Sequence, residues 1–81
     1  MKDQEIEARI QALVDEEHHL REQLASGEIS AAEEHARLAE AEASLDRMWD
    51  LLRQRRARRE FDEDPDQAEA RPVDEVEQYL Q

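Results

Sequence analysis

A single glycine divides this chain, and no other residue before Pro65 is one that breaks helices. Gly27 is the only glycine among 81 residues, and the two prolines are Pro65 and Pro72. Residues 2–26 and 31–61 therefore contain neither of the residues that interrupt helices. Because glycine commonly adopts the left-handed conformation that ends a helix, the sequence predicts two long helices joined by a short turn.

Apolar residues recur in steps of three and four in both runs, which is the pattern of helices that pack side by side. The first stripe contains Ile6, Ile10, Leu13, Leu20 and Leu24, widened by Val14, and the second contains Leu38, Ala41, Leu45, Met48 and Leu52, with Trp49 and Leu51 beside it. Ser30 and Glu33 form the Ser-x-x-Glu pattern of a helix start. We predict an all-α antiparallel hairpin with helices over residues 2–26 and 31–61 and a turn over 27–30.

Two glutamates occupy positions in the stripes at which apolar side chains are expected. Glu17 takes the missing position of the first stripe, and Glu34 lies at the start of the second. A carboxylate between two helices is costly unless it is paired. We therefore expect Arg21 and Arg37, which lie nearby in the hairpin, to pair with them across the two helices.

The register and the narrow seam of the hairpin bear on its oligomeric state. The short turn places Ile10 opposite Leu45, so the second helix is expected to overhang the first from Arg53 onward. One seam buries little apolar area, and a chain without cysteine has no disulfide to compensate. Because Trp49 and Leu51 extend the apolar arc, we expect a homodimer that forms a four-helix bundle. The alternative is a monomer whose Trp49 packs against the C-terminal tail.

The composition changes beyond the hairpin of residues 1–61. Residues 62–72 form an acidic linker that contains both prolines, and residues 73–81 form a short amphipathic tail with Pro72 at a favourable helix start. The apolar side chains of this tail are Val73, Val76, Tyr79 and Leu80. Because so short a helix is not stable alone, three alternatives are open. The tail docks on its own bundle, acts as a linear motif for another protein, or frays.

Five arginines cluster at the end of the second helix, in a chain whose net charge is -12: Arg53, Arg55, Arg56, Arg58 and Arg59. They neutralise the acidic start of the first helix and the acidic linker, bind an acidic protein surface, or contact phosphate or RNA. No glycine-rich loop or base-stacking aromatic accompanies them, which argues against the last interpretation. Opposite charges this close in sequence lead us to expect that the linker folds back over the arginines.

The chain lacks the patterns of an enzyme: no nucleophile–base pair, phosphate loop or paired acid site is visible. Glu16 and His19 have the Glu-x-x-His spacing of a metal site, but His19 faces solvent and Ala32 occupies the position of the matching glutamate. We expect no catalysis, metal or cofactor. The first residues carry no apolar run, so we expect a cytoplasmic protein that does not bind membranes.

The expected function is a small protein–protein interaction or oligomerisation module, an adaptor or regulator with an unidentified protein partner. The alternative is a factor associated with nucleic acid or ribonucleoprotein that uses the arginine cluster. The candidate partner-binding residues are Arg53, Arg55, Arg56, Arg58, Arg59, Trp49, Val73, Val76, Tyr79 and Leu80. Both hypotheses therefore depend on the C-terminal half of the chain.

Several segments resemble those of a family of short acidic actinobacterial proteins known as a domain of unknown function. These are residues 4–6, 12–18, 27–30, 49–59 and 71–81, of which the Trp-Asp-Leu-Leu-Arg-Gln-Arg-Arg stretch is the most specific. The resemblance implies an actinobacterial source and no established activity. Residues 20–45 also resemble SHOCT-type helical hairpins, and this resemblance implies a role in oligomerisation.

Overall fold

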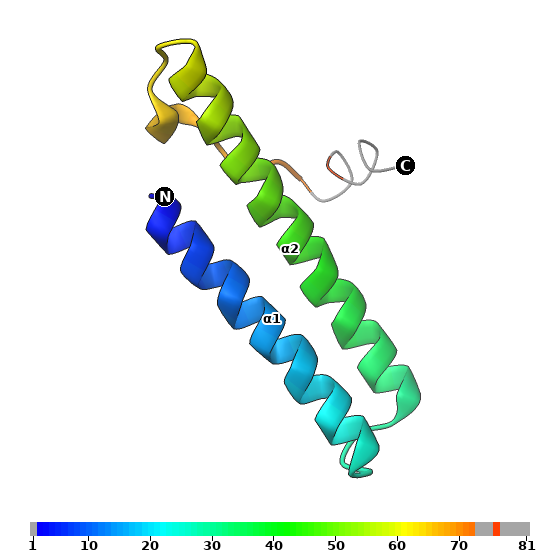
Figure 1. Cartoon of the computed structure of the whole chain (residues 1–81). Helices are drawn as coiled ribbons and strands as arrows, with labels where there is room; N and C mark the ends of the chain where they lie inside the picture. Colours follow the sequence, from blue (N-terminus) through cyan, green and yellow to red (C-terminus); the bar gives the residue numbers. More distant parts are fainter. Residues whose placement is uncertain (1, 73–75, 77–81) are drawn as a thin grey trace.

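The computed structural model describes residues 2–72 and residue 76. Within them the chain forms two α-helices, α1 (Asp3–Ala25) and α2 (Ala31–Glu60), and a short 3-10 helix, η1 (Pro65–Gln67). The two long helices lie side by side and run in opposite directions (Figure 1). The predicted all-α antiparallel hairpin is confirmed.

The turn between the helices forms for the local reasons that the sequence indicates. Gly27 has a φ of 79°, the left-handed conformation in which glycine meets no steric penalty. The N–H of Glu28 donates to the carbonyl of Gln23 at 2.9 Å and closes the end of α1. Ser30 Oγ accepts from the N–H of Glu33 at 3.1 Å, so it caps α2. The Glu33 carboxylate accepts from the Ser30 hydroxyl at 3.2 Å.

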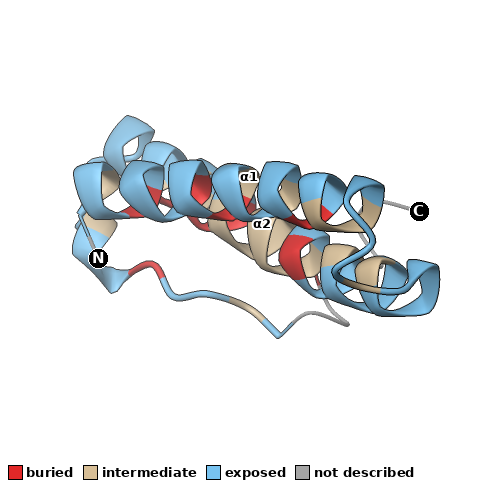
Figure 2. Cartoon of the chain, turned by 90° about the horizontal axis from the view of Figure 1, so that it is seen from below, coloured by how far each residue is buried: buried red, intermediate tan, exposed pale blue. Residues whose placement is uncertain are grey.

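The core follows the line along which α1 and α2 face each other (Figure 2). Its central cluster consists of Ile6, Ile10, Leu51 and Ala68, and the buried residues Leu13, Leu20 and Ala41 continue it toward the turn. Leu51 is only 3% exposed, whereas Leu45 and Leu52 are half-buried. The buried face of α2 is therefore rotated toward Leu51 relative to the predicted stripe. Ala68, which follows α2 in sequence, belongs to the same buried cluster as Leu51, so the segment after α2 adds to the burial of this face.

The two carboxylates in the stripes do not pair across the hairpin. Glu17 Oε2 lies 3.7 Å from Nη2 of Arg21, which is one turn further along the same helix. Its side chain is only 12% exposed, so the pair is formed at the edge of the seam. Glu34 is half-buried and makes no ion pair within residues 2–72. The expected pairing with Arg37 is thus wrong: Glu17 finds its partner within α1.

The chain reverses direction immediately after α2 and runs back along it (Figure 1). Asp62 has a φ of 55°, a left-handed conformation that aspartate tolerates better than most residues. The N–H of Glu63 donates to the carbonyl of Arg58 at 2.7 Å, the bond that completes this type of helix end. Pro65 then starts η1. We refer to residues 62–72 as the strap.

Candidate interaction surface

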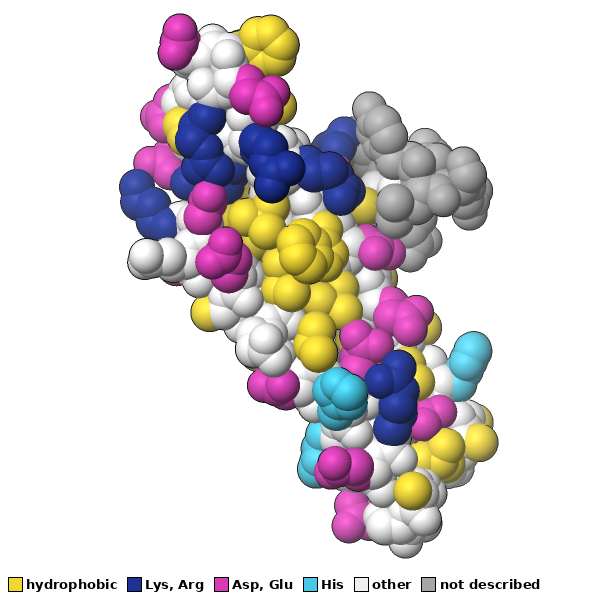
Figure 3. Space-filling model, viewed as in Figure 1, with side chains coloured by type: hydrophobic (Ala, Val, Ile, Leu, Met, Phe, Trp, Pro, Cys, Tyr) yellow, Lys and Arg dark blue, Asp and Glu magenta, His cyan; other side chains and the backbone are white. Residues whose placement is uncertain are grey.

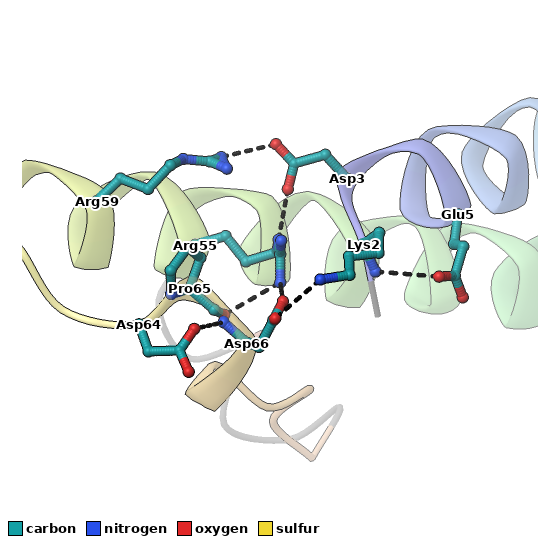
Figure 4. A network of polar contacts seen from close by, with 8 residues as sticks. All are labelled: Lys2, Asp3, Glu5, Arg55, Arg59, Asp64, Pro65 and Asp66. Atoms are coloured by element: carbon teal, nitrogen blue, oxygen red, sulfur yellow. Dashed lines mark hydrogen bonds and ion pairs between the residues drawn. The ribbon is translucent and has the colours of Figure 1, made fainter.

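One arginine joins the start of α1, the end of α2 and the strap (Figure 4). Arg55 is 5% exposed. Its Nε donates to the carboxylate of Asp3, and its Nη1 donates to the carbonyl of Pro65 at 3.1 Å and to Oδ1 of Asp66 at 3.0 Å. The guanidinium fork can serve several acceptors because it carries five N–H donors. Arg55 therefore binds the first residue of α1 and the start of η1 at once.

Each of the two carboxylates bound by Arg55 receives a second cation. Nη2 of Arg59 donates to Oδ2 of Asp3 at 2.6 Å, and Nζ of Lys2 donates to Oδ2 of Asp66 at 2.9 Å. The hydrogen bond from Arg55 is the main cause that lowers the pKa of Asp3. The pKa of Asp66 is lowered first by the hydrogen bond from Lys2 and then by that from Arg55. Both carboxylates therefore stay ionised in this network.

A second polar contact fastens the strap further along α2, around a buried carboxylate. Asp50 is 3% exposed and accepts from both Nε of Arg71, at 2.8 Å, and Nη2 of Arg71. Gln54 Nε2 donates to Oδ2 of Asp50 at 3.0 Å and to the carbonyl of Glu69 at 2.8 Å. Arg47 Nε donates to the carbonyl of Arg71 at 3.0 Å. The Arg71 fork is the main cause that lowers the pKa of Asp50.

Asp50 was not predicted as an anchor of the strap, although its position in the sequence indicates that it needs a partner. It lies between Trp49 and Leu51, in the most apolar part of α2. A carboxylate placed among apolar residues is costly unless it is paired, so its presence there indicates a cationic partner. That partner, Arg71, is far away in sequence, and periodicity does not identify such a distant contact.

Acid is expected to release the strap, because three carboxylates that hold it or border it have lowered pKa values. Asp3, Asp50 and Asp66 all titrate below the ordinary value of 3.8. A carboxylate whose pKa is lowered by folding stabilises the fold above that ordinary value, and the contribution is lost as the pH falls below it. Amide protection of residues 62–72, corrected for intrinsic exchange, should be constant between about pH 7 and 5 and fall below about pH 4. Unchanged protection at about pH 3 would show that these carboxylates do not hold the strap.

Within the described residues the arginine cluster is only partly neutralised. Arg55 and Arg59 bind Asp3, and Nη1 of Arg58 lies 3.5 Å from Oε2 of Glu63. The strap contacts Arg55 and Arg58 through Asp66 and Glu63, so the acidic linker folds back over these arginines, as expected. Arg53 and Arg56 are exposed and make no hydrogen bond or ion pair in the part of the chain that the structure describes.

Next to these two arginines, α2 presents an apolar surface to solvent. Trp49 is 49% exposed, and Leu38, Leu45 and Leu52 are half-buried. Because these leucines are seven residues apart, they share one line along the helix, which Arg56 extends by one turn. Figure 3 shows hydrophobic side chains gathered over the middle of the hairpin, with basic side chains toward one end. We call the surface formed by Leu38, Leu45, Trp49, Leu52 and Arg56 the open face.

The strap lies on the opposite side of α2 from the open face. Apart from Arg55, which also binds Asp3 of α1, its contacts with the helix come from Arg47, Asp50, Gln54 and Arg58, positions about half a turn around the helix from Leu45. Within residues 2–72 the strap therefore does not cover Trp49. The helix α2 has α1 on one side, the strap on a second and solvent on a third.

The tail contributes one residue to the described structure. Val76 is 1% exposed, and its N–H donates to the carbonyl of Pro72 at 3.2 Å, the spacing of a helical turn. Val73, Tyr79 and Leu80, the other three predicted partner-binding residues of the tail, lie outside the described residues. Val76 is buried and is therefore not available to a partner in this structure.

Outside the open face and the strap, the described residues form no metal site or membrane span. Glu16 and His19 are both exposed, and residues 2–72 contain no group of three or more His, Asp or Glu that could hold a metal ion. A hollow of about 190 Å³ between the helices is lined by side chains of both charges, among them Arg9, Glu16 and Arg37. No helix in the described part of the chain is long and apolar enough to cross a membrane.

Comparison with known proteins agrees with the resemblance to an actinobacterial family. The family described as "Protein of unknown function (DUF2630)" matches residues 2–81. Similar proteins include the uncharacterized proteins Rv0898c of Mycobacterium tuberculosis and Mb0922c of Mycobacterium bovis. Each is 52% identical over 77 residues, which cover 95% of this chain and 88% of the relative. No solved structure matches, and the comparisons do not show the resemblance to SHOCT-type hairpins.

Proposed function

This chain belongs to the DUF2630 family, and we propose that it is a small, non-catalytic, cytoplasmic protein-interaction module, an adaptor or regulator, that binds through the open face of α2. The observation that carries this proposal is the exposure of Trp49. Almost half of this side chain faces solvent, although α1 and the strap cover other sides of the same helix. Tryptophan is among the residues that contribute most to binding at protein interfaces.

The surroundings of Trp49 also suit an interface. The half-buried Leu45 and Leu52 form an apolar surface next to it, and Arg53 and Arg56 stand beside this surface without a described partner. Protein interfaces commonly combine an apolar centre with a polar rim, and they are enriched in tryptophan and arginine. The open face therefore has the composition of an interface.

The strap supports the proposal because it holds α2 in place from behind. Arg55 and Asp50 bind the strap at two points along the helix, through Asp66 and Arg71. A surface on a rigid element loses little conformational entropy when a partner binds. The strap therefore lets a two-helix chain present a preorganised binding face.

The alternative function is association with nucleic acid through the arginine cluster. Arg53 and Arg56 are the observation in its favour, because they are exposed and unpaired within residues 2–72. Arg55, Arg58 and Arg59 are engaged by carboxylates. Binding to phosphates grows with the number of available cations, so two arginines on a chain of net charge -12 favour a protein partner.

Site-specific photo-crosslinking in a mycobacterial host tests the proposal. A benzophenone amino acid replaces Trp49 in one variant and the exposed Ala8 of α1 in a control. We expect discrete protein adducts at position 49, whether with another protein or with a second copy of the chain, and none at position 8. Adducts that nuclease removes would favour the nucleic-acid alternative. Equal adduct patterns at both positions would contradict the open face as the binding surface.

A further inference from the structure

The two halves of α2 carry opposite charge. Residues 31–45 contain four acidic residues and one arginine, whereas residues 46–60 contain six arginines and three acidic residues. Two such helices in parallel would place like charges together, whereas an antiparallel pair places the acidic half of each beside the basic half of the other. Charge complementarity of this kind selects the orientation of helix pairs.

The open face is also symmetric in its spacing. Leu38 and Leu52 are equally far from Leu45 along α2, and so are Glu34 and Arg56. Steps of four and seven residues keep all five on one line of the helix. When a second α2 lies antiparallel on this line, Leu45 meets its own copy, Leu38 meets Leu52, and Glu34 meets Arg56.

We propose that the partner of the open face is a second copy of this chain, paired through antiparallel α2 helices about a two-fold axis at Leu45. The proposal rests on the proposed function, since it names the occupant of the same surface. A two-fold interface requires a surface complementary to itself, and the stripe from Glu34 to Arg56 has this property in both the spacing of its leucines and its charge.

The two charged ends of the stripe support this pairing independently. Glu34 is half-buried and Arg56 is exposed, and neither has an ion pair or side-chain hydrogen bond among residues 2–72. Within one chain the two side chains are far apart, at opposite ends of the stripe. In the antiparallel pair they meet twice, once on each side of the two-fold axis.

The pairing also supplies the buried area that a single hairpin lacks. The central cluster of the hairpin contains three residues of the two helices and one of the strap, and Leu45, Met48 and Leu52 only border it. Short chains bury little apolar surface, so association adds to the stability that the hairpin and the strap have alone. A second α2 on the open face would complete the burial of Leu45 and Leu52 and cover Trp49.

Cysteine cross-linking tests the register, and the chain contains no cysteine of its own. Leu45→Cys, Leu38→Cys and Leu52→Cys are made separately in the full chain and oxidised, and circular dichroism verifies their helicity. We expect a disulfide dimer of Leu45→Cys. We also expect Leu38→Cys, labelled with ¹⁵N, to form mainly mixed dimers when it is oxidised together with unlabelled Leu52→Cys. Homodimers of Leu52→Cys in excess of mixed dimers, or no disulfide in any variant, would overturn the pairing.

A charge exchange tests the same register with surface substitutions that do not disturb the core. Arg56→Glu and Glu34→Arg should each weaken dimerisation about tenfold, because each places like charges together at two symmetric positions. The double variant should recover most of the loss, since it restores opposite charges. Failure of the double variant to recover would overturn the register. If the cross-linker at position 49 captures only another protein and the cysteine variants stay monomeric, self-pairing is wrong and the interaction function stands.

Discussion

Leu51→Asp is expected to unfold the hairpin. Leu51 is 3% exposed and packs against Ile6, Ile10 and Ala68, so the new carboxylate would be buried without a partner. Such burial costs several kcal/mol, and small domains have total stabilities of only about 5 to 15 kcal/mol. Far-UV circular dichroism should show loss of most helical signal at about 25 °C at low micromolar concentration.

Trp49→Asp is the matched control, because it places the same side chain on α2 at an exposed position. We expect this variant to remain helical, since Trp49 contributes little to the core within one chain. Leu45→Asp should have an intermediate effect because Leu45 is half-buried. A folded Leu51→Asp beside an unfolded Leu45→Asp would mean that the predicted stripe, and not the face rotated toward Leu51, is the buried one.

Arg55→Ala is expected to have the second largest effect, a loss of about 2 kcal/mol of stability together with release of the strap. The substitution removes the donor that joins Asp3, Asp66 and the carbonyl of Pro65. Removing one partner of a buried polar contact costs about 1 to 3 kcal/mol. Thermal unfolding measures the loss, and amide exchange of residues 62–72 measures the release.

Arg55→Lys separates the charge from the geometry of this contact. Lysine keeps the positive charge but lacks the planar fork that serves several acceptors. We expect partial recovery of stability and incomplete protection of the strap. Wild-type stability in Arg55→Ala would show that the other contacts of the strap, such as Asp50–Arg71, are sufficient to hold it.

The helices and their turn could be predicted because the signals for them are local. Gly27 ends α1 and Ser30 caps α2, and both act through backbone geometry within a few residues. The reversal at Asp62 was not predicted, because left-handed backbone at a residue other than glycine has no reliable signal in sequence. The proline that follows indicated only that a helix should stop.

The side of α2 that is buried was predicted only in part: Ala41 is buried and Leu45, Met48 and Leu52 pack against the core, but the burial of Asp50 and Leu51 does not follow from periodicity. The heptad pattern reflects packing against the partner helix alone. Such packing would favour burial of Leu45 and Leu52. The strap adds Ala68 next to Leu51 and Arg71 next to Asp50, and these contacts join residues far apart in sequence. Periodicity therefore predicts the hairpin but not the third segment that rotates its buried face.

The candidate site was predicted in part. Folding of the acidic linker onto the arginines followed from opposite charges close in sequence, and Asp66 and Glu63 make these contacts. Trp49 was a candidate because it extends the apolar arc beside the second stripe, and its exposure gives that candidate a location on the side of α2 away from the strap. The homodimer remains a prediction, now with a defined face and a defined two-fold axis.

Sedimentation equilibrium of the full chain, with Trp49→Asp as the comparison, tests the pairing through the open face most directly. If the open faces pair, the wild-type protein approaches twice the 9.5 kDa of one chain at micromolar concentrations. Trp49→Asp then stays at the mass of one chain while keeping its helicity. A wild-type protein that stays monomeric at high micromolar concentration, or a dimer that Trp49→Asp leaves unchanged, would contradict the account.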